Sequence, residues 1–218
     1  MNARCPSVSE GEPVHVVGYS FGASITLTLL TTRPDLLASV TVHEPPLFAV
    51  LDGTHDRAVA DALAVMEREL REVTSLLEAG DHARAARLFV EEVAFGPRSW
   101  GQLPDALRQT FLANAPTFLD ERHDPSWMSI DDVALAATTV PTLLTSGTES
   151  PVWFPAVIAE LAALLPHARV EVLTGAGHAP HVSHPDRWLA TLLSFQDDLR
   201  RPPVAVGPGA DAQRARVS

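Results

Sequence analysis

Residues 18–22 place a serine between two glycines in the pattern Gly-x-Ser-x-Gly. The motif follows a short β-branched run and precedes an apolar stretch too long for a strand, which predicts a sharp strand-to-helix turn. Such a turn strains the backbone of Ser20, and Gly18 and Gly22 leave out side chains that would clash there. Backbone N–H groups at a helix N-terminus favour negative charge, so Ser20 is a candidate nucleophile and the Phe21 N–H a candidate oxyanion donor.

A serine hydroxyl is a weak nucleophile unless a neighbouring base takes its proton. His178 follows Gly177 in a glycine-rich loop between the last expected strand and the last expected helix, and such a loop can bring its imidazole to Ser20. His181 and His184 are the competing histidines of the same segment. Because no acid or cysteine cluster stands beside them, we expect no metal site there.

These groups must be positioned by regular elements around them. The expected strands are 14–18, 39–43, 140–146 and 169–173. The expected helices are 21–30, 56–79, 82–94, 103–114, 155–165 and 185–199. Strands that alternate with helices are typical of a parallel sheet, so the predicted fold class is α/β with a parallel sheet of about four strands.

The chain divides into a core, an insert and two ends. Residues 13–50 and 138–200 are expected to form the α/β core, and residues 51–137 a helical cap inserted into it. Residues 1–12 and 201–218 are small, polar or rich in proline and glycine, which predicts a disordered lead-in and a disordered tail.

Composition narrows the classes of partner and location. The 218 residues carry a net charge of −11, which would repel a phosphate backbone, so nucleic-acid binding is not expected. No apolar run approaches the roughly 20 residues needed to span a bilayer, and no signal peptide is visible. We expect a cytoplasmic protein that does not bind a membrane.

Taken together, residues 13–199 resemble the α/β-hydrolase superfamily. Gly-Tyr-Ser-Phe-Gly is similar to its nucleophile elbow, and Gly-Ala-Gly-His to its histidine loop. The resemblance implies Ser20 as nucleophile, His178 as base and the middle helices as a lid. A serine at the elbow separates the chain from relatives such as haloalkane dehalogenases and epoxide hydrolases, which use a carboxylate nucleophile.

The triad acid has two candidates. Relatives usually carry an aspartate shortly after a glycine at the end of the late strand, and here Ser150 occupies that position with Glu149 directly before it. Some relatives instead carry the acid after the strand that follows the elbow, where Glu44 stands. We favour Glu149, whose length would let it reach, and keep Glu44 as the alternative. Either carboxylate could hold the tautomer of His178.

The resemblance also implies a larger sheet, in which several strands precede the elbow and one of their loops supplies a second oxyanion donor. This chain reaches its elbow at Ser20, so we expect the second half of that fold. The elbow strand would then form an edge of the sheet. An exposed apolar edge favours pairing with another chain, which predicts a homo-oligomer or another association through that edge.

The leading functional hypothesis is a serine hydrolase of esters or related small acyl compounds that needs no metal or cofactor. The same groups could cleave an activated C–C bond or transfer an acyl group. The alternative is an N-terminally truncated, impaired hydrolase that acts at most as a binding or assembly module, since losing an oxyanion donor costs about 100- to 1000-fold in turnover. A nucleotide-binding domain is not expected, because residues 18–22 lack the Gly-x-Gly-x-x-Gly spacing.

Overall fold

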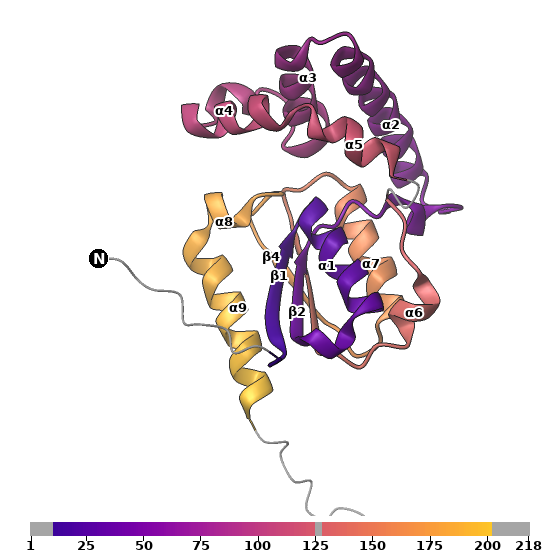
Figure 1. Cartoon of the computed structure of the whole chain (residues 1–218), viewed down its shortest axis with the longest axis vertical. Helices are drawn as coiled ribbons and strands as arrows, with labels where there is room; N and C mark the ends of the chain where they lie inside the picture. The colour runs from indigo at the N-terminus through magenta and orange to yellow at the C-terminus, as the bar shows by residue number, and fades with distance from the viewer. Residues whose placement is uncertain (1–10, 125–127, 202–218) are drawn as a thin grey trace, which may run out of the picture.

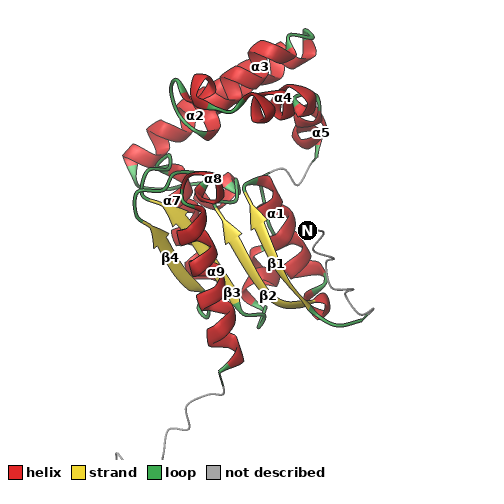
Figure 2. Ribbon diagram, turned by 90° about the vertical axis from the view of Figure 1, so that its left-hand side faces the viewer, coloured by secondary structure: helices red, strands yellow, loops and turns green. Residues whose placement is uncertain are grey.

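The computed structural model describes residues 11–124 and 128–201. Its parallel strands form one sheet in the order β1-β2-β3-β4 (Figure 2). The strands are β1 (Val14–Tyr19), β2 (Leu37–His43), β3 (Thr142–Gly147) and β4 (Arg169–Leu173). The α/β class and the four parallel strands are therefore confirmed. The predicted disordered ends fall almost entirely outside the described residues.

Helices cover both faces of this sheet, and a further group of helices lies above the carboxyl ends of its strands (Figure 2). They are α1 (Phe21–Thr32), α2 (Arg57–Glu78), α3 (His82–Leu88), α4 (Asp105–Asn114), α5 (Thr117–His123), α6 (Asp132–Ala136), α7 (Trp153–Leu164), α8 (Pro180–Ser183) and α9 (Pro185–Arg200). Helices α1, α6 and α7 lie on one side of the sheet and α9 on the other, while α2–α5 stand above the strand ends (Figure 1). No helix of the described ranges is long and apolar enough to cross a membrane.

The strand register explains where a site can form. Tyr19 of β1 pairs with His43 of β2, so the residues that follow them begin at the same level. Because all four strands are parallel, their carboxyl ends share one edge of the sheet, where ligands of open α/β sheets bind. Strand β1 is an outer strand, as expected for the elbow strand, and its Val17 is 46% exposed.

The main core lies between the sheet and the helices α1 and α7. Leu27 of α1, Val42 of β2, Leu144 of β3 and Val157 of α7 are fully buried within it. Strand β2 is buried at all but one of its positions and β3 at every position, as expected for parallel strands covered on both faces. Pro141 has no N–H to donate to the sheet, and β3 begins one residue after it, later than the sequence suggests.

The helices α2–α5 have a small core of their own. Helix α2 buries one stripe at helical spacing, and its Val73 and Leu77 pack with Ala85 and Ala86 of α3. Asp56 caps its N-terminus by accepting hydrogen bonds from the first-turn backbone. The division of residues 51–137 as a cap remains a prediction, and α6 at its end packs against α1 and α7.

One helix differs in kind from its prediction. The pattern over 82–94 predicts a single helix, but the structure has α3 followed by a π-helical turn, Phe89–Ala94. The wider turn changes the direction of the side chains after α3, and such turns are frequent at functional sites. The short helices α5, α6 and α8 were not predicted, because a helix of one or two turns gives too little apolar periodicity.

Candidate active site

Ser20 sits in the strained turn that the sequence predicts between β1 and α1. Its φ of 52° and ψ of −126° are unusual for a residue with a side chain. A Cβ on Gly18 would meet the Thr26 hydroxyl and lie 2.6 Å from the carbonyl oxygen of Gly22, so position 18 requires glycine. The expectation for Gly22 is wrong, since a Cβ there would have nothing within 4 Å.

His178 is the histidine that reaches Ser20. Its Nε2 lies 3.0 Å from Ser20 Oγ, and its side chain is almost fully buried. The competing histidines lie elsewhere: His181 packs its ring against Tyr19, with centroids 4.7 Å apart, and His184 bonds to Ser183 through Nδ1.

The histidine loop can approach the sheet because two glycines make room for it. Gly175 has a φ of 77°, which favours glycine, and a Cβ on Gly147 at the end of β3 would collide with the Ala176 carbonyl group. The backbone N–H of Glu149 donates to the Ala176 carbonyl oxygen at 2.9 Å. The loop is therefore held against the end of β3 before His178 begins.

Glu44 is the carboxylate that contacts this histidine. Its Oε2 lies 2.6 Å from His178 Nδ1, and its Oε1 accepts a hydrogen bond of 2.7 Å from the Gly147 N–H. The side chain is completely buried, and its φ of 48° turns it toward the loop. Both oxygens therefore have a donor, as a buried carboxylate requires.

The preference for Glu149 as the neighbour of His178 is corrected. Glu149 is exposed, and its Oε1 lies 3.4 Å from the Thr148 hydroxyl. The reason is local: the backbone N–H of Glu149 donates to the Ala176 carbonyl oxygen of the histidine loop, and in this position the Glu149 side chain points into solvent. The structure brings together Ser20, His178 and the alternative acid Glu44.

The electrostatics of Glu44 favour its charged form. Burial alone would raise the pKa of this carboxyl group, but the hydrogen bond from His178 and the neighbouring imidazoles outweigh it and hold the pKa below its ordinary value. Burial, and to a smaller extent the Glu44 carboxylate, raise the pKa of Tyr19, so its phenol stays protonated. A charged Glu44 can stabilise an imidazolium at His178.

His43 is a site neighbour that sequence reasoning did not single out. Its ring is fully buried at the end of β2, with Nδ1 3.0 Å from Thr145 Oγ1 and Nε2 3.6 Å from Glu44 Oε2. Burial lowers its pKa to about 4 despite the opposing effect of Glu44, so the ring is neutral near pH 7. The available signal was its place directly before Glu44, on a strand beside the elbow.

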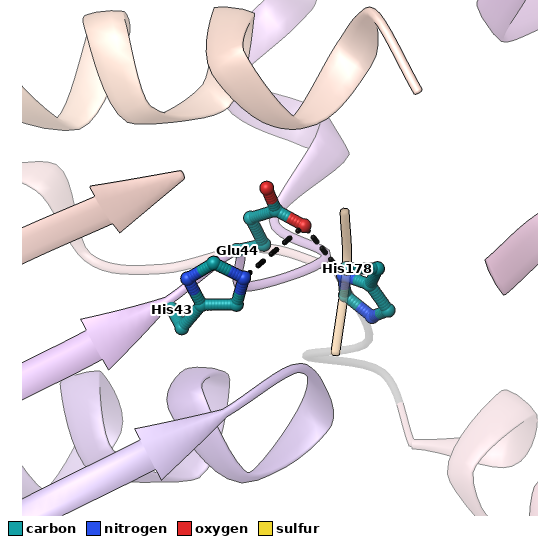
Figure 3. A group of neighbouring side chains, drawn as sticks. All are labelled: His43, Glu44 and His178. Atoms are coloured by element: carbon teal, nitrogen blue, oxygen red, sulfur yellow. Dashed lines mark hydrogen bonds and ion pairs between the residues drawn. The ribbon is translucent and has the colours of Figure 1, made fainter. Parts of the chain in front are cut away.

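The group of His43, Glu44 and His178 is compact enough to hold a metal ion, with ligand atoms within 4.8 Å of one another (Figure 3). The hydrogen bonds give each group another use. Glu44 already accepts from His178 and Gly147, and His178 uses its second nitrogen toward Ser20. This arrangement suits proton transfer along one line of atoms.

Aromatic side chains enclose the imidazole of His178. Phe154 of α7 stacks on it with ring centroids 4.3 Å apart and planes 11° from parallel, and Tyr19 lies at 5.0 Å. Phe95, which follows the π-helical turn, lies at 6.0 Å. These contacts restrict the ring and exclude water from its faces.

Two cavities open beside Ser20, beneath the helices α2–α5. The larger has a volume of about 270 Å³ and the smaller about 50 Å³. Both are bordered by Ser20, Phe21, Phe89, Phe118 and Glu121. Apolar side chains such as Val73 and Leu77 form most of the remaining wall of the larger one. The nucleophile candidate thus faces a mainly apolar space.

Comparison with known proteins agrees with this architecture. The alpha/beta hydrolase family profile matches residues 3–192. The biotin biosynthesis bifunctional protein BioHC of Teredinibacter turnerae is 28% identical over 190 residues, which are 82% of this chain and 32% of that protein. The sn-1-specific diacylglycerol lipase ABHD11 of Mus musculus is 23% identical over 196 residues, 84% of this chain and 59% of that protein.

Among solved structures, MenH from S. aureus superposes with a TM-score of 0.64 at 16% identity, over 87% of this chain and 70% of that one. At that identity the likeness shows the fold alone. The chain spans about a third of the length of BioHC and about three-fifths of that of ABHD11. Because the family profile matches most of its residues, the chain belongs to the alpha/beta hydrolase family.

Proposed function

We propose that this protein is a serine hydrolase that cleaves an ester or a related small acyl compound through Ser20, His178 and Glu44. One observation carries the proposal: an unbroken line of hydrogen bonds runs from Ser20 Oγ to His178 Nε2 at 3.0 Å, and from His178 Nδ1 to Glu44 Oε2 at 2.6 Å. A nucleophile, a base and a group that orients the base are the parts this chemistry needs.

In the first half of the reaction, Ser20 Oγ attacks the carbonyl carbon while its proton passes to His178 Nε2. Glu44 holds the Nδ1–H of the ring, so that Nε2 presents its lone pair, and then stabilises the imidazolium. The tetrahedral intermediate carries a negative oxygen, for which the Phe21 N–H at the start of α1 is the proposed donor. His178 returns the proton to the departing alcohol, leaving an acyl-Ser20.

In the second half, a water molecule gives its proton to His178 Nε2 and attacks the acyl-Ser20 carbonyl. The second tetrahedral intermediate collapses, Ser20 Oγ recovers the proton and the carboxylic acid leaves. The apolar cavity at Ser20 suits the hydrocarbon part of the acyl group. Two relatives of this chain are named as a diacylglycerol lipase and a biotin biosynthesis protein, and both names are compatible with a substrate that has a hydrocarbon acyl part.

A fluorophosphonate probe tests the proposal directly, because an activated serine attacks its phosphorus, displaces fluoride and becomes phosphonylated. We expect labelling of the purified protein and its complete loss in Ser20→Ala. Ser75→Ala is the matched control, since Ser75 lies on the exposed side of α2 and its hydroxyl donates to the carbonyl oxygen of Arg71 in the same helix. Hydrolysis of p-nitrophenyl butyrate should be lost in Ser20→Ala and kept in Ser75→Ala.

A folded, monodisperse protein that resists the probe and leaves the ester intact would contradict the proposal. That outcome would favour the alternative hypothesis, in which the chain is an impaired hydrolase that acts as a binding or assembly module. Circular dichroism on the same samples establishes that they are folded.

A further inference from the structure

Glu121 of α5 is an acidic side chain placed at the nucleophile without a role in the proposed proton transfer. It borders both cavities, at the part of the wall that they share with Ser20 and Phe21. Two phenylalanines, Phe89 and Phe118, complete this shared border. A carboxylate therefore stands in an apolar wall beside the reacting serine.

Among the residues that border the two cavities, only His178 could carry a positive charge to balance that of Glu121. Apart from His178, Glu121 is the only acidic or basic residue among those that border the two cavities. Within residues 11–124 and 128–201, the structure shows no hydrogen bond or ion pair to its carboxylate. Burial raises the pKa of the Glu121 carboxyl group.

A half-buried carboxylate without a partner is unfavourable, and such groups concentrate at binding sites. An apolar side chain would fill the same wall at lower cost if Glu121 only closed the cavity. Thr117, one turn before Glu121 on α5, and Asn114, the last residue of α4, also border the larger cavity and add hydrogen-bonding atoms to its wall. The mainly apolar space thus has a few polar groups in its wall, and the one carboxylate among them borders both cavities together with Ser20.

We propose that Glu121 recognises a positively charged amino group on the acyl part of the substrate. The inference rests on the proposed function, which it deepens by naming a substrate class. An ammonium group would donate a hydrogen bond to the carboxylate and balance its charge in a site of low polarity. The net charge of −11 favours the approach of cations. An anionic acyl group would meet the carboxylate, and no arginine or lysine is among the residues that border the two cavities.

Three p-nitrophenyl esters of matched length test this recognition: ε-aminocaproate, caproate and the monoester of adipate. We expect kcat/KM to fall in that order, with about a tenfold advantage for ε-aminocaproate over caproate, as for one charge-assisted hydrogen bond. Glu121→Gln should remove that advantage, so that ε-aminocaproate and caproate have about equal kcat/KM in the variant. Glu121→Lys should reverse the order, so that the adipate monoester becomes better than ε-aminocaproate.

Asp120→Asn is the matched control, because Asp120 is the exposed acid next to Glu121 on the same helix. It removes the same charge from the protein but none from the cavity wall, so the ester preference should not change. Equal kcat/KM for the three esters in wild type would overturn the inference. So would an equal loss on all three esters in Glu121→Gln, which would mean that Glu121 only shapes the cavity.

A binding measurement separates this inference from the proposed hydrolysis. In Ser20→Ala, isothermal titration calorimetry should detect ε-aminocaproamide more strongly than caproamide, and Glu121→Gln in that background should abolish the difference. Amine binding without ester hydrolysis or probe labelling in the Ser20 protein would refute the proposed function and keep the recognition by Glu121. Hydrolysis of caproate with no amine preference in either measurement would refute the recognition alone.

Discussion

Replacing Glu44 by glutamine is the sharpest test of the assignment of the acid. The two side chains have the same size, but a carboxylate offers an acceptor at both oxygens and an amide at only one. Glu44 uses both, since Oε1 accepts from the Gly147 N–H at 2.7 Å and Oε2 lies 2.6 Å from His178 Nδ1. A glutamine at this position can therefore accept a hydrogen bond from only one of these two donors.

Each orientation of the glutamine has a definite cost. With its amide group toward His178, it donates to Nδ1 and selects the tautomer whose Nε2 carries a proton, which cannot accept one from Ser20. With its oxygen toward His178, its amide faces the Gly147 N–H, donor against donor in a fully buried place. Neither orientation supplies the negative charge that stabilises the imidazolium.

The expected loss in kcat is about 10⁴-fold, the size seen when the acid of a serine triad becomes an amide, and it corresponds to about 5 kcal/mol of activation free energy. Glu149→Gln is the matched control and should stay within about twofold of wild type, because its side chain is exposed and does not contact His178. The assay is hydrolysis of p-nitrophenyl butyrate at saturating concentration, with thermal melting to establish folding.

Two results would refute this reasoning. The first is a folded Glu44→Gln whose kcat lies within about tenfold of wild type. The second is a greater loss in Glu149→Gln than in Glu44→Gln, which would return the role to the acid that the loop pattern favours. If Glu44→Gln does not fold, Glu44→Asp keeps the charge, and its shorter side chain should lower kcat while retaining labelling of Ser20 by the fluorophosphonate.

Three further predictions concern pH, the elbow and the sheet edge. Burial lowers the pKa of His43 from 6.5 to about 4, so between these pH values the unfolded chain binds a proton that the folded chain does not. About 3 kcal/mol of unfolding free energy should therefore be lost as pH falls from 6.5 to 4. Urea denaturation at several pH values should show that the unfolding free energy of His43→Gln depends less on pH than that of wild type. Gly18→Ala should lower the unfolding free energy by about 2 kcal/mol or more, because its Cβ would collide with the backbone of Gly22 and Ala23. Gly22→Ala should change the unfolding free energy by no more than about 0.5 kcal/mol in the same denaturation experiment, because a Cβ there has open space. Equal effects of the two substitutions would contradict this geometry. We propose association through β1, so size-exclusion chromatography should show wild type above the monomer mass and Val17→Glu closer to it, and a monomeric wild type would contradict this.

The parts of the fold that sequence predicts best are those with strong local patterns. The strand-to-helix turn at Ser20 was visible because a fixed motif, a β-branched run and a long apolar stretch coincide. The long helix α2 was visible because its apolar stripe is continuous and Asp56 marks its start. In both cases several residues close together in the sequence predict the same local structure.

The parts that were missed depend on contacts distant in sequence. Glu121 lies on α5, whose seven residues give no readable period, and only the fold places it beside Ser20. The open space at Gly22 was also invisible, since the motif does not say which glycine is crowded. The choice between Glu44 and Glu149 failed for a related reason: a loop pattern gives the position of a residue but not the direction of its side chain.

The direction of Glu44 follows from the geometry that it shares with Ser20. Tyr19 and His43 are register partners at the ends of β1 and β2, so Ser20 and Glu44 are equivalent next residues on neighbouring strands. Both have a positive φ, 52° and 48°, and the Ser20 N–H donates to the His43 carbonyl oxygen at 2.9 Å, which ties the two turns together. Two adjacent parallel strands that are each followed by a residue of positive φ bring both side chains to the end of the sheet, where the loop after β4 places His178. Residues with a positive φ are usually glycine or asparagine, and position 44 is a glutamate. The sequence therefore predicts the strand before Glu44 but not the turn that directs its side chain.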